Sequence, residues 1–530
     1  MKKKLLNIAI RVDANDQIGG GHFRRCLSLA EELKLRGHKI LIISASLPIK
    51  FCQTLKDLSL AYSLLDPFEQ NKKQRELQEK SEYGKWLSMP INLDAEKTNR
   101  LLKSFNPHWV IFDNYGLDFQ WVNQVKKNVA RIPFLAIDDL DNRHLGADVI
   151  LDQTSLIKRK QNHISLTTLV GPSFTLLAKS YYELREKSIS ERAKRLNENS
   201  TFRKFSILIS VGMYDPKKII PKLLETIAII DNVQIEVTTS SDSQTILEIK
   251  QIVERYPNIS LHLDRIDISF LMANADLCIG ASGMSVWERS CLALPTITIA
   301  LVKNQRVLAK ELKRIQAAKV MTLTQIRNKK YLFNEVKSLI NNREELKELS
   351  RNSQNLCDGL GVQRVAAILE ANLRPVQIAD SANLLEWRNK RSVREGSLDS
   401  KLISKEEHLL WVEKILNDEN GIWLIYSEGG LDIGHCNCKF LSKKIVVWSF
   451  YIGENFAYKG SGKRMLSFFL KYLFYVKTIE QVYAEVLRTN IKSKLIHKHF
   501  GFTQVKRNQN LLKYSLSKGQ FRSRFYSLTG

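Results

Sequence analysis

With 530 residues, of which 44% are hydrophobic and 9% aromatic, the chain is too long for a single hydrophobic core and has the composition of a folded, multidomain protein. Its 81 Lys and Arg residues outnumber 55 Asp and Glu residues, so the net charge of +26 suits anionic ligands. The basic residues are spread along the chain and are not interleaved with aromatic residues on one sheet, which argues against nucleic acid as a partner.

The apolar segments are too short for membrane insertion. The first apolar run is interrupted by Arg11 and Asp13, and the later run MLSFFLKYLFYV is interrupted by Lys471. Cys436 and Cys438 are one residue apart, a spacing that fits neither a zinc nor a redox motif. We therefore expect a cytoplasmic protein with reduced thiols and no metal site. No pattern in the sequence indicates an oligomeric state.

Residues 1–185 are predicted to form a first α/β lobe. Short apolar runs such as LLNIAIRV, KILIIS, WVIFDNYG and DVILDQ alternate with helical periodicity, which predicts a parallel sheet covered by helices. Ligands of such sheets bind beyond the carboxyl ends of the strands. The loop GGGH, residues 19–22, and the pair Asp113 and Tyr115 both occupy that position.

The GGGH loop indicates a site for an anionic ligand beside His22. Glycines allow the backbone to approach a ligand closely, and the first N–H groups of a helix attract phosphate. Histidine titrates near neutrality, so His22 suits a general base. The alternative is a loop histidine that only binds phosphate or caps the helix.

Residues 200–372 are predicted to form a second α/β lobe, because the alternation restarts at FSILISVG after a charged connection. In GASGMSVWERSCLALP, a strand, a small-residue loop and a helix follow one another, and the loop N–H groups suit a diphosphate. Glu288 lies one turn into that helix and can accept hydrogen bonds from ribose hydroxyls. A tight strand-to-helix junction without a ligand is the alternative.

Residues 376–518 are predicted to form an α+β domain, and residues 519–530 a basic tail. Two helical segments precede antiparallel-looking strands, and the loop YKGSGKR then opens an amphipathic helix. The complete fold class is therefore α/β, with two Rossmann-like lobes followed by a smaller α+β domain.

The first two lobes resemble the UDP-sugar hydrolases of pseudaminic acid biosynthesis. The resemblance covers about residues 5–370 and rests on motifs in the family's order: RVDANDQIGGGHFRRCLSLAEEL, FDNYGLD, SVGMYDPKK, GASGMSVWERSCLALP, NQ and CDGLGVQRV. It implies a glycosyltransferase-B fold and hydrolysis of UDP-2,4-diacetamido-2,4,6-trideoxy-β-L-altropyranose to UDP and free sugar. The chain departs from the family at Met213, where a second glycine is usual.

Carried over to this sequence, the resemblance makes His22 the base that activates water, with Gly21 keeping the backbone clear. The residues on the sugar side would be Asp13, Asp113 and Tyr115. The residues that hold UDP would be Ser282, Gly283, Ser285, Glu288, Asn304 and Gln305.

The third domain resembles GNAT-type N-acetyltransferases, in particular those that acetylate the 4-amino group of a UDP-sugar in the same pathway. The motif NFAYKGSGKRMLSFFL matches the coenzyme A loop of this family, with Ala457 where Gln or Arg is usual. The resemblance implies acetyl-CoA as co-substrate, bound by Gly460, Ser461, Gly462, Lys463 and Asn490. It also places His497 where the family has a Tyr that protonates the departing thiolate; a surface position on a helix is the alternative.

Together these resemblances predict a bifunctional enzyme whose partners are two small molecules, a UDP-sugar and acetyl-CoA. Two alternatives remain at this point. The first two lobes would serve equally for transfer of the sugar to an acceptor, and the third domain would serve as a non-catalytic binding module if its departures abolished acetyl transfer.

Overall fold

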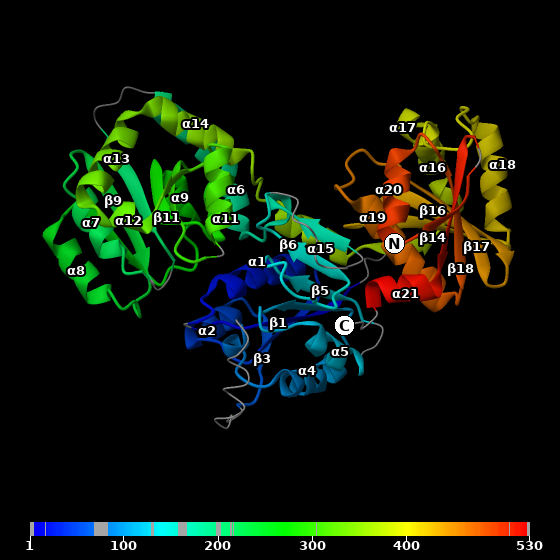
Figure 1. The fold of residues 1–530 in the computed structure, drawn as a ribbon, viewed down its shortest axis with the longest axis horizontal. Helices are drawn as coiled ribbons and strands as arrows, with labels where there is room; N and C mark the ends of the chain where they lie inside the picture. The colour runs from blue at the N-terminus through cyan, green and yellow to red at the C-terminus, as the bar shows by residue number, and fades with distance from the viewer. Residues whose placement is uncertain are drawn as a thin grey trace.

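The computed structural model describes residues 5–15, 17–67, 83–128, 132–156, 167–197, 203–212, 215, 217–303, 305–507 and 509–526. They form three domains, each built on one β-sheet, and Figure 1 shows the first lobe between the other two. The first two sheets are parallel and the third is mixed, as the alternation of strands and helices predicts.

The first lobe is a seven-stranded parallel sheet in the order β3-β2-β1-β4-β5-β6-β7. Its strands are β1 (Asn7–Val12), β2 (Lys39–Ser44), β3 (Ala61–Leu64), β4 (Trp109–Asp113), β5 (Phe134–Ile137), β6 (Val149–Asp152) and β7 (Thr167–Val170). Its helices are α1 (Gly21–Leu35), α2 (Ile49–Asp57), η1 (Gly84–Trp86), α4 (Ile91–Phe105), α5 (Phe119–Lys126) and η2 (Pro172–Phe174). The chain order reverses between β1 and β4, where doubly wound sheets bind ligands.

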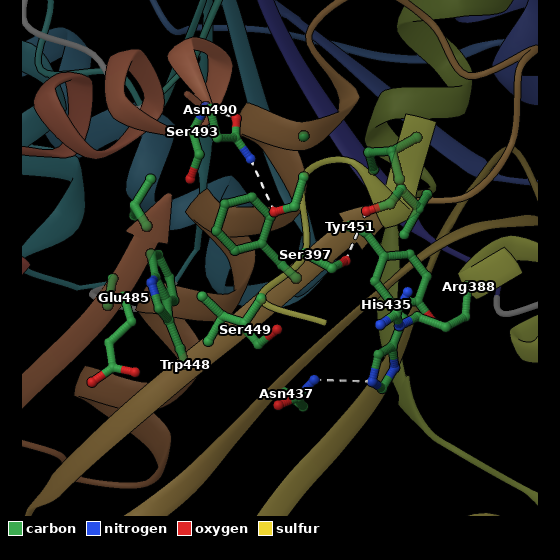
Figure 2. A pocket seen from close by; sticks show the side chains of 18 of the residues that line it. Arg388, Ser397, His435, Asn437, Trp448, Ser449, Tyr451, Glu485, Asn490 and Ser493 are labelled. Atoms are coloured by element: carbon green, nitrogen blue, oxygen red, sulfur yellow. Dashed lines mark hydrogen bonds between the residues drawn. The ribbon is translucent and has the colours of Figure 1, made fainter. Parts of the chain in front are cut away.

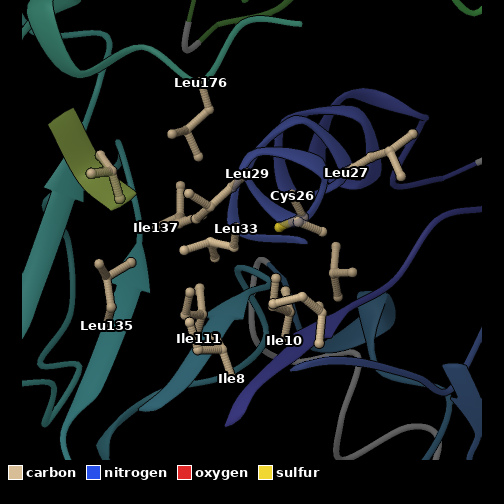
Figure 3. Close-up of a cluster of buried hydrophobic side chains, with 14 of the residues drawn as sticks. Ile8, Ile10, Cys26, Leu27, Leu29, Leu33, Ile111, Leu135, Ile137 and Leu176 are labelled. Carbon is tan, nitrogen blue, oxygen red and sulfur yellow. The ribbon is translucent and has the colours of Figure 1, made fainter. Parts of the chain in front are cut away.

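A buried apolar cluster fixes α1 on this sheet. Figure 3 shows Ile8 and Ile10 of β1, with Ile111 of β4, facing Cys26, Leu29 and Leu33 of α1. These residues have almost no exposed surface, because α1 turns every third or fourth side chain toward the sheet. The N-terminus of α1, with His22, therefore lies over the carboxyl ends of β1 and β4.

The second lobe repeats this plan with the strand order β10-β9-β8-β11-β12-β13. Its strands are β8 (Phe205–Ser210), β9 (Val233–Thr239), β10 (Ile259–Leu263), β11 (Leu277–Ala281), β12 (Thr296–Ile299) and β13 (Lys319–Met321). Its helices are α6 (Lys179–Asn197), α7 (Ile220–Ile227), α8 (Ile246–Arg255), α9 (Ser269–Asn274), α10 (Ser285–Cys291), α11 (Gln305–Arg314), α12 (Leu323–Arg327), α13 (Lys329–Asn341) and α14 (Arg343–Gln354). The chain reverses its order between β8 and β11, so the loop before α10 lies at the corresponding ligand-binding position.

Helix α15 (Gly361–Leu369), which we predicted as the end of the second lobe, packs on the first lobe instead. Val365 and Ile368 are buried in the same cluster as the β1 and α1 side chains. A Cβ on Gly361 would lie 2.2 Å from the carbonyl oxygen of Thr175, so only glycine allows this close return. The helical pattern predicted α15, but the pattern carries no information on which core the helix covers.

The third domain has the strand order β14-β15-β16-β17-β18-β20-β19. Its strands are β14 (Asn372–Pro375), β15 (Gly421–Glu428), β16 (Leu431–Ser442), β17 (Ile445–Ile452), β18 (Gln481–Leu487), β19 (Thr503–Arg507) and β20 (Leu511–Ser517). Its helices are η3 (Ile378–Asp380), α16 (Ser381–Asn389), α17 (Arg391–Arg394), α18 (Lys405–Leu416), α19 (Ser461–Lys471), η4 (Tyr472–Val476), α20 (Ile491–Phe500) and α21 (Lys518–Tyr526). β17 and β18 pair in parallel, whereas the other described pairs of this sheet are antiparallel.

Helix α21 occupies most of the segment that we predicted as a basic tail. Phe521 is fully buried, and its ring lies 5.2 Å from that of Phe474. Arg524 also donates a hydrogen bond to the carbonyl of His499 at 2.9 Å. One buried aromatic residue among basic ones therefore anchors this segment to the third domain.

The third domain is docked on the first lobe through α19 and α15. Lys471 of α19 contacts Asp148 of the first lobe at 2.9 Å, and the amide of Gly429 donates to the carbonyl of Ala367 at 3.1 Å. Since Lys126 also lies 3.8 Å from Asp148, two cations from different domains share this buried carboxylate. Burial raises the pKa of Asp148, but Lys471 and Lys126 outweigh it and hold that pKa at about 2.

Candidate functional sites

The site in the first lobe is built where β1 gives way to α1. Gly19 has a φ of +77°, a conformation that favours glycine, and Gly20 is the N-cap of the helix. A Cβ on Gly21 would meet no atom within 4 Å, so the space in front of the helix is open. His22, the second residue of α1, is 8% exposed and lies beside this space.

Asp113 holds the imidazole of His22. The distance from His22 Nδ1 to Asp113 Oδ1 is 2.6 Å. Two lone pairs would repel each other at this distance, so Nδ1 carries a proton and donates it to the carboxylate. The lone pair of a neutral His22 therefore lies on Nε2, which is the arrangement that a general base requires.

The structure corrects the expected role of Asp113, which we predicted on the sugar side of the site. Its side chain is fully buried, and Arg25 donates from Nε and Nη2 to Asp113 Oδ2 and Oδ1 at 2.5 and 2.6 Å. Burial raises the pKa of Asp113, but Arg25 and His22 outweigh it and hold the pKa well below its usual value. Asp113 is therefore a permanent anion that orients His22 and does not face a substrate.

Asp13 is also turned into the protein and not toward a sugar. Its Oδ1 accepts from Arg11 Nη1 at 2.6 Å and from the amide of Ala45 at 2.7 Å, and its Oδ2 accepts from Asn114 at 2.7 Å. Arg11 in turn donates to Asp94, so a buried charged network ties the ends of β1, β2 and β4 together. Asp13 stabilises the loops around the site because a buried carboxylate must be paired.

Aromatic side chains that sequence reasoning missed surround His22. Tyr115 lies edge-on to the imidazole at 4.7 Å between ring centres, and Trp86 lies edge-on at 5.3 Å. Trp86 stacks on Tyr115, and Tyr83 contacts both rings. The Tyr115 hydroxyl donates to Asp139. Tyr115 thus lies beside His22, and its contact with a sugar stays a prediction, whereas Tyr83 and Trp86 come from a segment with no recognisable motif.

In the second lobe, the small-residue loop and the first turn of α11 lie together. Ser282 is buried and its hydroxyl pairs with that of Thr298 at 2.8 Å, while Ser285 accepts from Arg289 at 3.0 Å. The amide of Gln305 would lie 3.4 Å from a Cβ on Gly283, and its Oε1 accepts from the amide of Leu301 at 2.9 Å. Asn304 lies outside the described residues, as does Met213.

Glu288 lies on α10 near the first lobe. Burial raises the pKa of its carboxyl group above the usual value, although Arg24 and Arg289 act in the opposite direction. Arg24 belongs to α1, so the carboxyl group of Glu288 lies within electrostatic range of the first lobe. Its predicted contact with ribose remains a prediction.

The two candidate loops approach each other across the lobes. Arg25 Nη1 of α1 lies 3.9 Å from Met284 Sδ, and Met284 is the residue between Gly283 and Ser285. Arg24 donates to the carbonyl of Arg265 at 2.9 Å, and Lys50 lies 3.2 Å from Asp264. The N-terminal ends of α1 and α10 therefore share one interlobe region, with His22 beside it.

The third domain contains a cavity of about 970 Å³ between β17, β18 and the helices α16 to α18. The paired registers of β17 and β18 end at Trp448 and Ala484, although both strands continue, so the strands splay apart at the cavity. Figure 2 shows Trp448, Ser449 and Tyr451 along one side, with Glu485 and Asn490 on neighbouring elements. Unpaired backbone groups of β17 can thus accept an extended ligand.

The loop before α19 is held by a buried ion pair. Arg464 donates from Nε and Nη2 to Glu428 at 2.5 and 3.0 Å, and both side chains are 2% exposed. Gly460 has a φ of +90°, and Gly462 lines the cavity next to it. The Ser461 hydroxyl contacts Glu428 and the carbonyl of Tyr458, so this side chain faces inward, and the predicted binding of the cofactor by the loop stays a prediction. Lys463 is partly buried beside Gly462.

His497 does not have the geometry of the predicted proton donor. Its Nδ1 donates to the carbonyl of Ser493 at 2.7 Å, and its Nε2 accepts from the Trp448 indole at 3.1 Å. Burial lowers the pKa of His497 to about 4, so the imidazole is neutral near pH 7 and has no free proton to give. His497 instead fixes Trp448 at the splay point of the strands.

Four further polar residues line the cavity: Asn490, His435, Arg388 and His408. Asn490 caps α20, donates to the carbonyl of Gly396 at 3.2 Å and lines the cavity, and its contact with acetyl-CoA stays a prediction. His435 is buried and its pKa is lowered by burial to about 4. Arg388 Nη1 and His408 Nε2 are buried without a hydrogen-bond partner in the described part of the chain, so both can receive a polar ligand.

The described residues contain neither a metal-binding cluster nor a helix that could span a membrane. No group of three or more His, Cys, Asp or Glu side chains among them is placed to hold a metal ion. None of the helices in the described ranges has both the length and the apolar composition needed to cross a membrane.

A protein-family model matches most of the third domain. Residues 373–516 match the acetyltransferase (GNAT) domain family. The chain is 23% identical over 523 residues to an uncharacterized protein, MJ1062, of Methanocaldococcus jannaschii. The aligned region covers 95% of this chain and 98% of that protein. It is 25% identical over 203 residues to the spore coat polysaccharide biosynthesis protein SpsG of Bacillus subtilis, or 38% of this chain and 57% of that one.

Among solved structures, the chain is similar to Acinetobacter baumannii MurG at 16% identity and a TM-score of 0.47. That similarity covers 69% of this chain and 99% of the other. The topology is described without it: the six strands of the second parallel sheet have the order of the first six strands of the first, and one mixed sheet follows. The chain therefore consists of two Rossmann-like lobes followed by a mixed-sheet domain that matches the acetyltransferase (GNAT) domain family.

Proposed function

We propose that this chain carries out two consecutive reactions on a UDP-linked amino sugar. The third domain acetylates the 4-amino group with acetyl-CoA, and the two lobes then hydrolyse the acetylated product to UDP and a free 2,4-diacetamido sugar. The sequence resemblance favours UDP-2,4-diacetamido-2,4,6-trideoxy-β-L-altropyranose as the substrate of hydrolysis. The similarity to a polysaccharide biosynthesis protein is consistent with a role in sugar metabolism.

One observation carries the proposal for hydrolysis. A histidine whose Nδ1 is held by a buried carboxylate lies next to the interlobe region onto which the second-lobe loop opens. A base and a diphosphate site on opposite lobes are the two components that cleavage of a UDP-sugar requires.

The proposed hydrolysis needs a base, a water molecule and the UDP-sugar. His22 Nε2 takes a proton from water as the water oxygen forms a bond to the anomeric carbon of the sugar. The bond between that carbon and the phosphate oxygen breaks, and UDP leaves with the electron pair. Removing a general base of this kind typically costs about 10²- to 10⁴-fold in rate. The aromatic rings of Tyr115 and Trp86 exclude bulk water from the imidazole.

In the third domain, residues of this chain orient the substrates and supply the base that accepts the proton of the attacking amine. Acetyl-CoA, when bound, supplies the activated acetyl group. Glu485 is the first residue of β18 beyond the last residue paired with β17, and it lines the cavity. It can accept the proton of the attacking amine through one water, and the leaving thiolate takes its proton from solvent because His497 is unable to donate one. Arg388 and His408 offer free polar atoms to the amino-sugar nucleotide.

The test follows product masses when the full chain is incubated with the UDP-4-amino sugar and acetyl-CoA. We expect an acetylated UDP-sugar first, and then UDP and free diacetamido sugar without any added acceptor. His22→Ala should accumulate the acetylated UDP-sugar, and Glu485→Gln should slow its formation. If UDP-sugar persists until an acceptor is added, the lobes transfer the sugar and do not hydrolyse it.

A further inference from the structure

Arg25 connects the imidazole of His22 to the second lobe. It lies three residues after His22 on α1, so both side chains project from the same face of the helix. Its side chain is only 4% exposed. A buried guanidinium is costly unless each of its donors has a use.

Two of its three nitrogens are committed to Asp113. Arg25 Nε and Nη2 form a two-point contact with the carboxylate, and Nη2 also lies 3.1 Å from His22 Nδ1. A fork of this kind fixes the plane of the carboxylate, and the carboxylate in turn fixes the imidazole. Without Arg25, Asp113 would be free to rotate away from His22.

The third nitrogen lacks a strong acceptor. Arg25 Nη1 forms an ion pair with Asp139 Oδ2 at 3.7 Å, which is too long for a hydrogen bond, and a weak contact with Met284 Sδ at 3.9 Å. Asp139 already accepts from the Tyr115 hydroxyl. Nη1 is therefore a buried cationic donor that points at the loop formed by residues 282–285.

We propose that Arg25 acts on both sides of the hydrolysis reaction. Through Asp113 it positions His22, and through Nη1 it binds an anionic oxygen of the diphosphate and stabilises the charge that develops as UDP departs. The inference rests on the proposed function, because it takes a nucleoside diphosphate as the ligand of the second-lobe loop. Guanidinium groups suit phosphate oxygens, and they act most strongly in a site shielded from water.

Two variants separate the two roles. Arg25→Gln removes both the fork and the cation, whereas Asp113→Asn keeps Arg25 but leaves His22 without its carboxylate. Lys34→Gln serves as the matched control, because Lys34 lies at the exposed C-terminal end of the same helix and donates only to carbonyls of residues 58 and 59. Thermal unfolding of each full-length variant shows whether it is folded.

The measurement is UDP and uridine binding to the full chain by calorimetry, with hydrolysis rates alongside. We expect Arg25→Gln to weaken UDP binding about 10- to 100-fold while uridine binding stays the same, because only UDP carries the phosphates. Asp113→Asn should keep UDP affinity within about twofold yet lower the hydrolysis rate by about 10²-fold or more. Lys34→Gln should match the parent in both.

The outcomes are distinct. Normal UDP affinity in Arg25→Gln with loss of hydrolysis would overturn the diphosphate role and leave only positioning. Normal affinity and normal rate would overturn the whole inference. Failure of the unaltered chain to bind UDP would overturn the proposed function itself. If Arg25→Gln does not fold, Arg25→Lys decides: it keeps a cation but not the fork, so it should retain UDP affinity within a few-fold and lose hydrolysis.

Discussion

The two histidines predicted to move protons differ in what their nitrogens contact. His22 donates from Nδ1 to a buried carboxylate, which leaves Nε2 for a substrate. His497 donates to a backbone carbonyl and accepts from an indole, so both nitrogens are occupied. The same residue type at a predicted catalytic position therefore has one nitrogen free for the proposed base role in one domain, and fixes a neighbouring side chain in the other. Hydrogen-bond partners, and not residue identity, decide the difference.

The largest expected effect tests this comparison directly. His22→Ala should lower the rate of UDP release by about 10²- to 10⁴-fold, because it removes the group that we propose takes the proton of water. His497→Ala should lower acetyl transfer by less than about tenfold, although leaving the Trp448 indole unpaired should cost about 1–3 kcal/mol of stability. Both reactions are measured on both full-length variants by product mass.

If the effects of His22→Ala and His497→Ala were exchanged, the contrast drawn between the two histidines would be wrong. If His497→Ala abolished acetyl transfer while its thermal unfolding matched the parent, His497 would have a chemical role that its neutral, fully bonded state does not allow. Each variant also serves as the control for the other, because the reaction in the unaltered domain should continue.

The fold was predictable because apolar periodicity is local, whereas the partners of site residues are not. The runs that became β1, β4, β8 and β11 are short and apolar, and the loops that follow them were found as ligand positions. Asp13 directly follows β1 and Asp113 is the last residue of β4, so the two look equivalent in the sequence. Asp13 pairs with Arg11, whereas Asp113 pairs with His22 and Arg25. Only the structure shows this difference.

Arg25 was within reach of sequence reasoning. It stands one helical turn after His22 in GGGHFRRC, so the spacing places both on one face. The partner, Asp113, is 88 residues away, and no local pattern joins them. Trp86 and Tyr83 were beyond reach, because a tryptophan and a tyrosine in an unremarkable segment carry no sign of the fold that brings them to His22.

A second prediction concerns the buried ion pair that holds the loop before α19. Glu428→Ala should lower the stability of the third domain by about 3–5 kcal/mol, because it leaves the Arg464 guanidinium buried without its carboxylate. Acetyl-CoA binding, measured by calorimetry, should weaken with it. Hydrolysis in the first two lobes should fall far less, since His22 is held by a separate buried pair.

The matched control is an exposed ion pair of the same domain. Glu480→Ala removes the partner of Lys444, and both side chains are more than half exposed. Such pairs contribute about 0–1 kcal/mol. Equal losses of stability from Glu428→Ala and Glu480→Ala, measured by urea unfolding, would show that burial does not set the value of the Arg464 pair.

A third prediction uses acid to separate the domains. Burial lowers the pKa of His435 and of His497 from 6.5 to about 4, so between these values the unfolded chain binds protons that the folded domain does not. The unfolding free energy therefore falls as the pH falls from 6.5 to 4, by about 3 kcal/mol for each histidine. The contribution of Asp113, whose pKa is lowered from 3.8, is lost only below that value.

Hydrogen exchange corrected for its intrinsic pH dependence measures this separation. Peptides of β16 and α20 should lose protection between pH 6.5 and 4.5 before peptides of β4 and α1. The variant His497→Gln has no group to titrate at this position, so its pH dependence should be shallower by about one proton than that of the parent. Equal loss in all three domains would contradict the assignment.

The smallest expected effect lies at the junction of the two regions. Lys471→Met removes one of two cations on Asp148, and the remaining Lys126 keeps the carboxylate paired. We expect a loss of about 1 kcal/mol or less in thermal unfolding, because the Lys471 side chain is 27% exposed and screened by water. Both activities should change less than about twofold, with Lys444→Met as the exposed control. Since Lys471 ends the helix that opens at the Gly460 loop, and Asp148 belongs to the lobe of His22, a larger drop in hydrolysis would mean that docking tunes the base. The site around His22 would then depend on the docking of the third domain, and the two sites would not be independent.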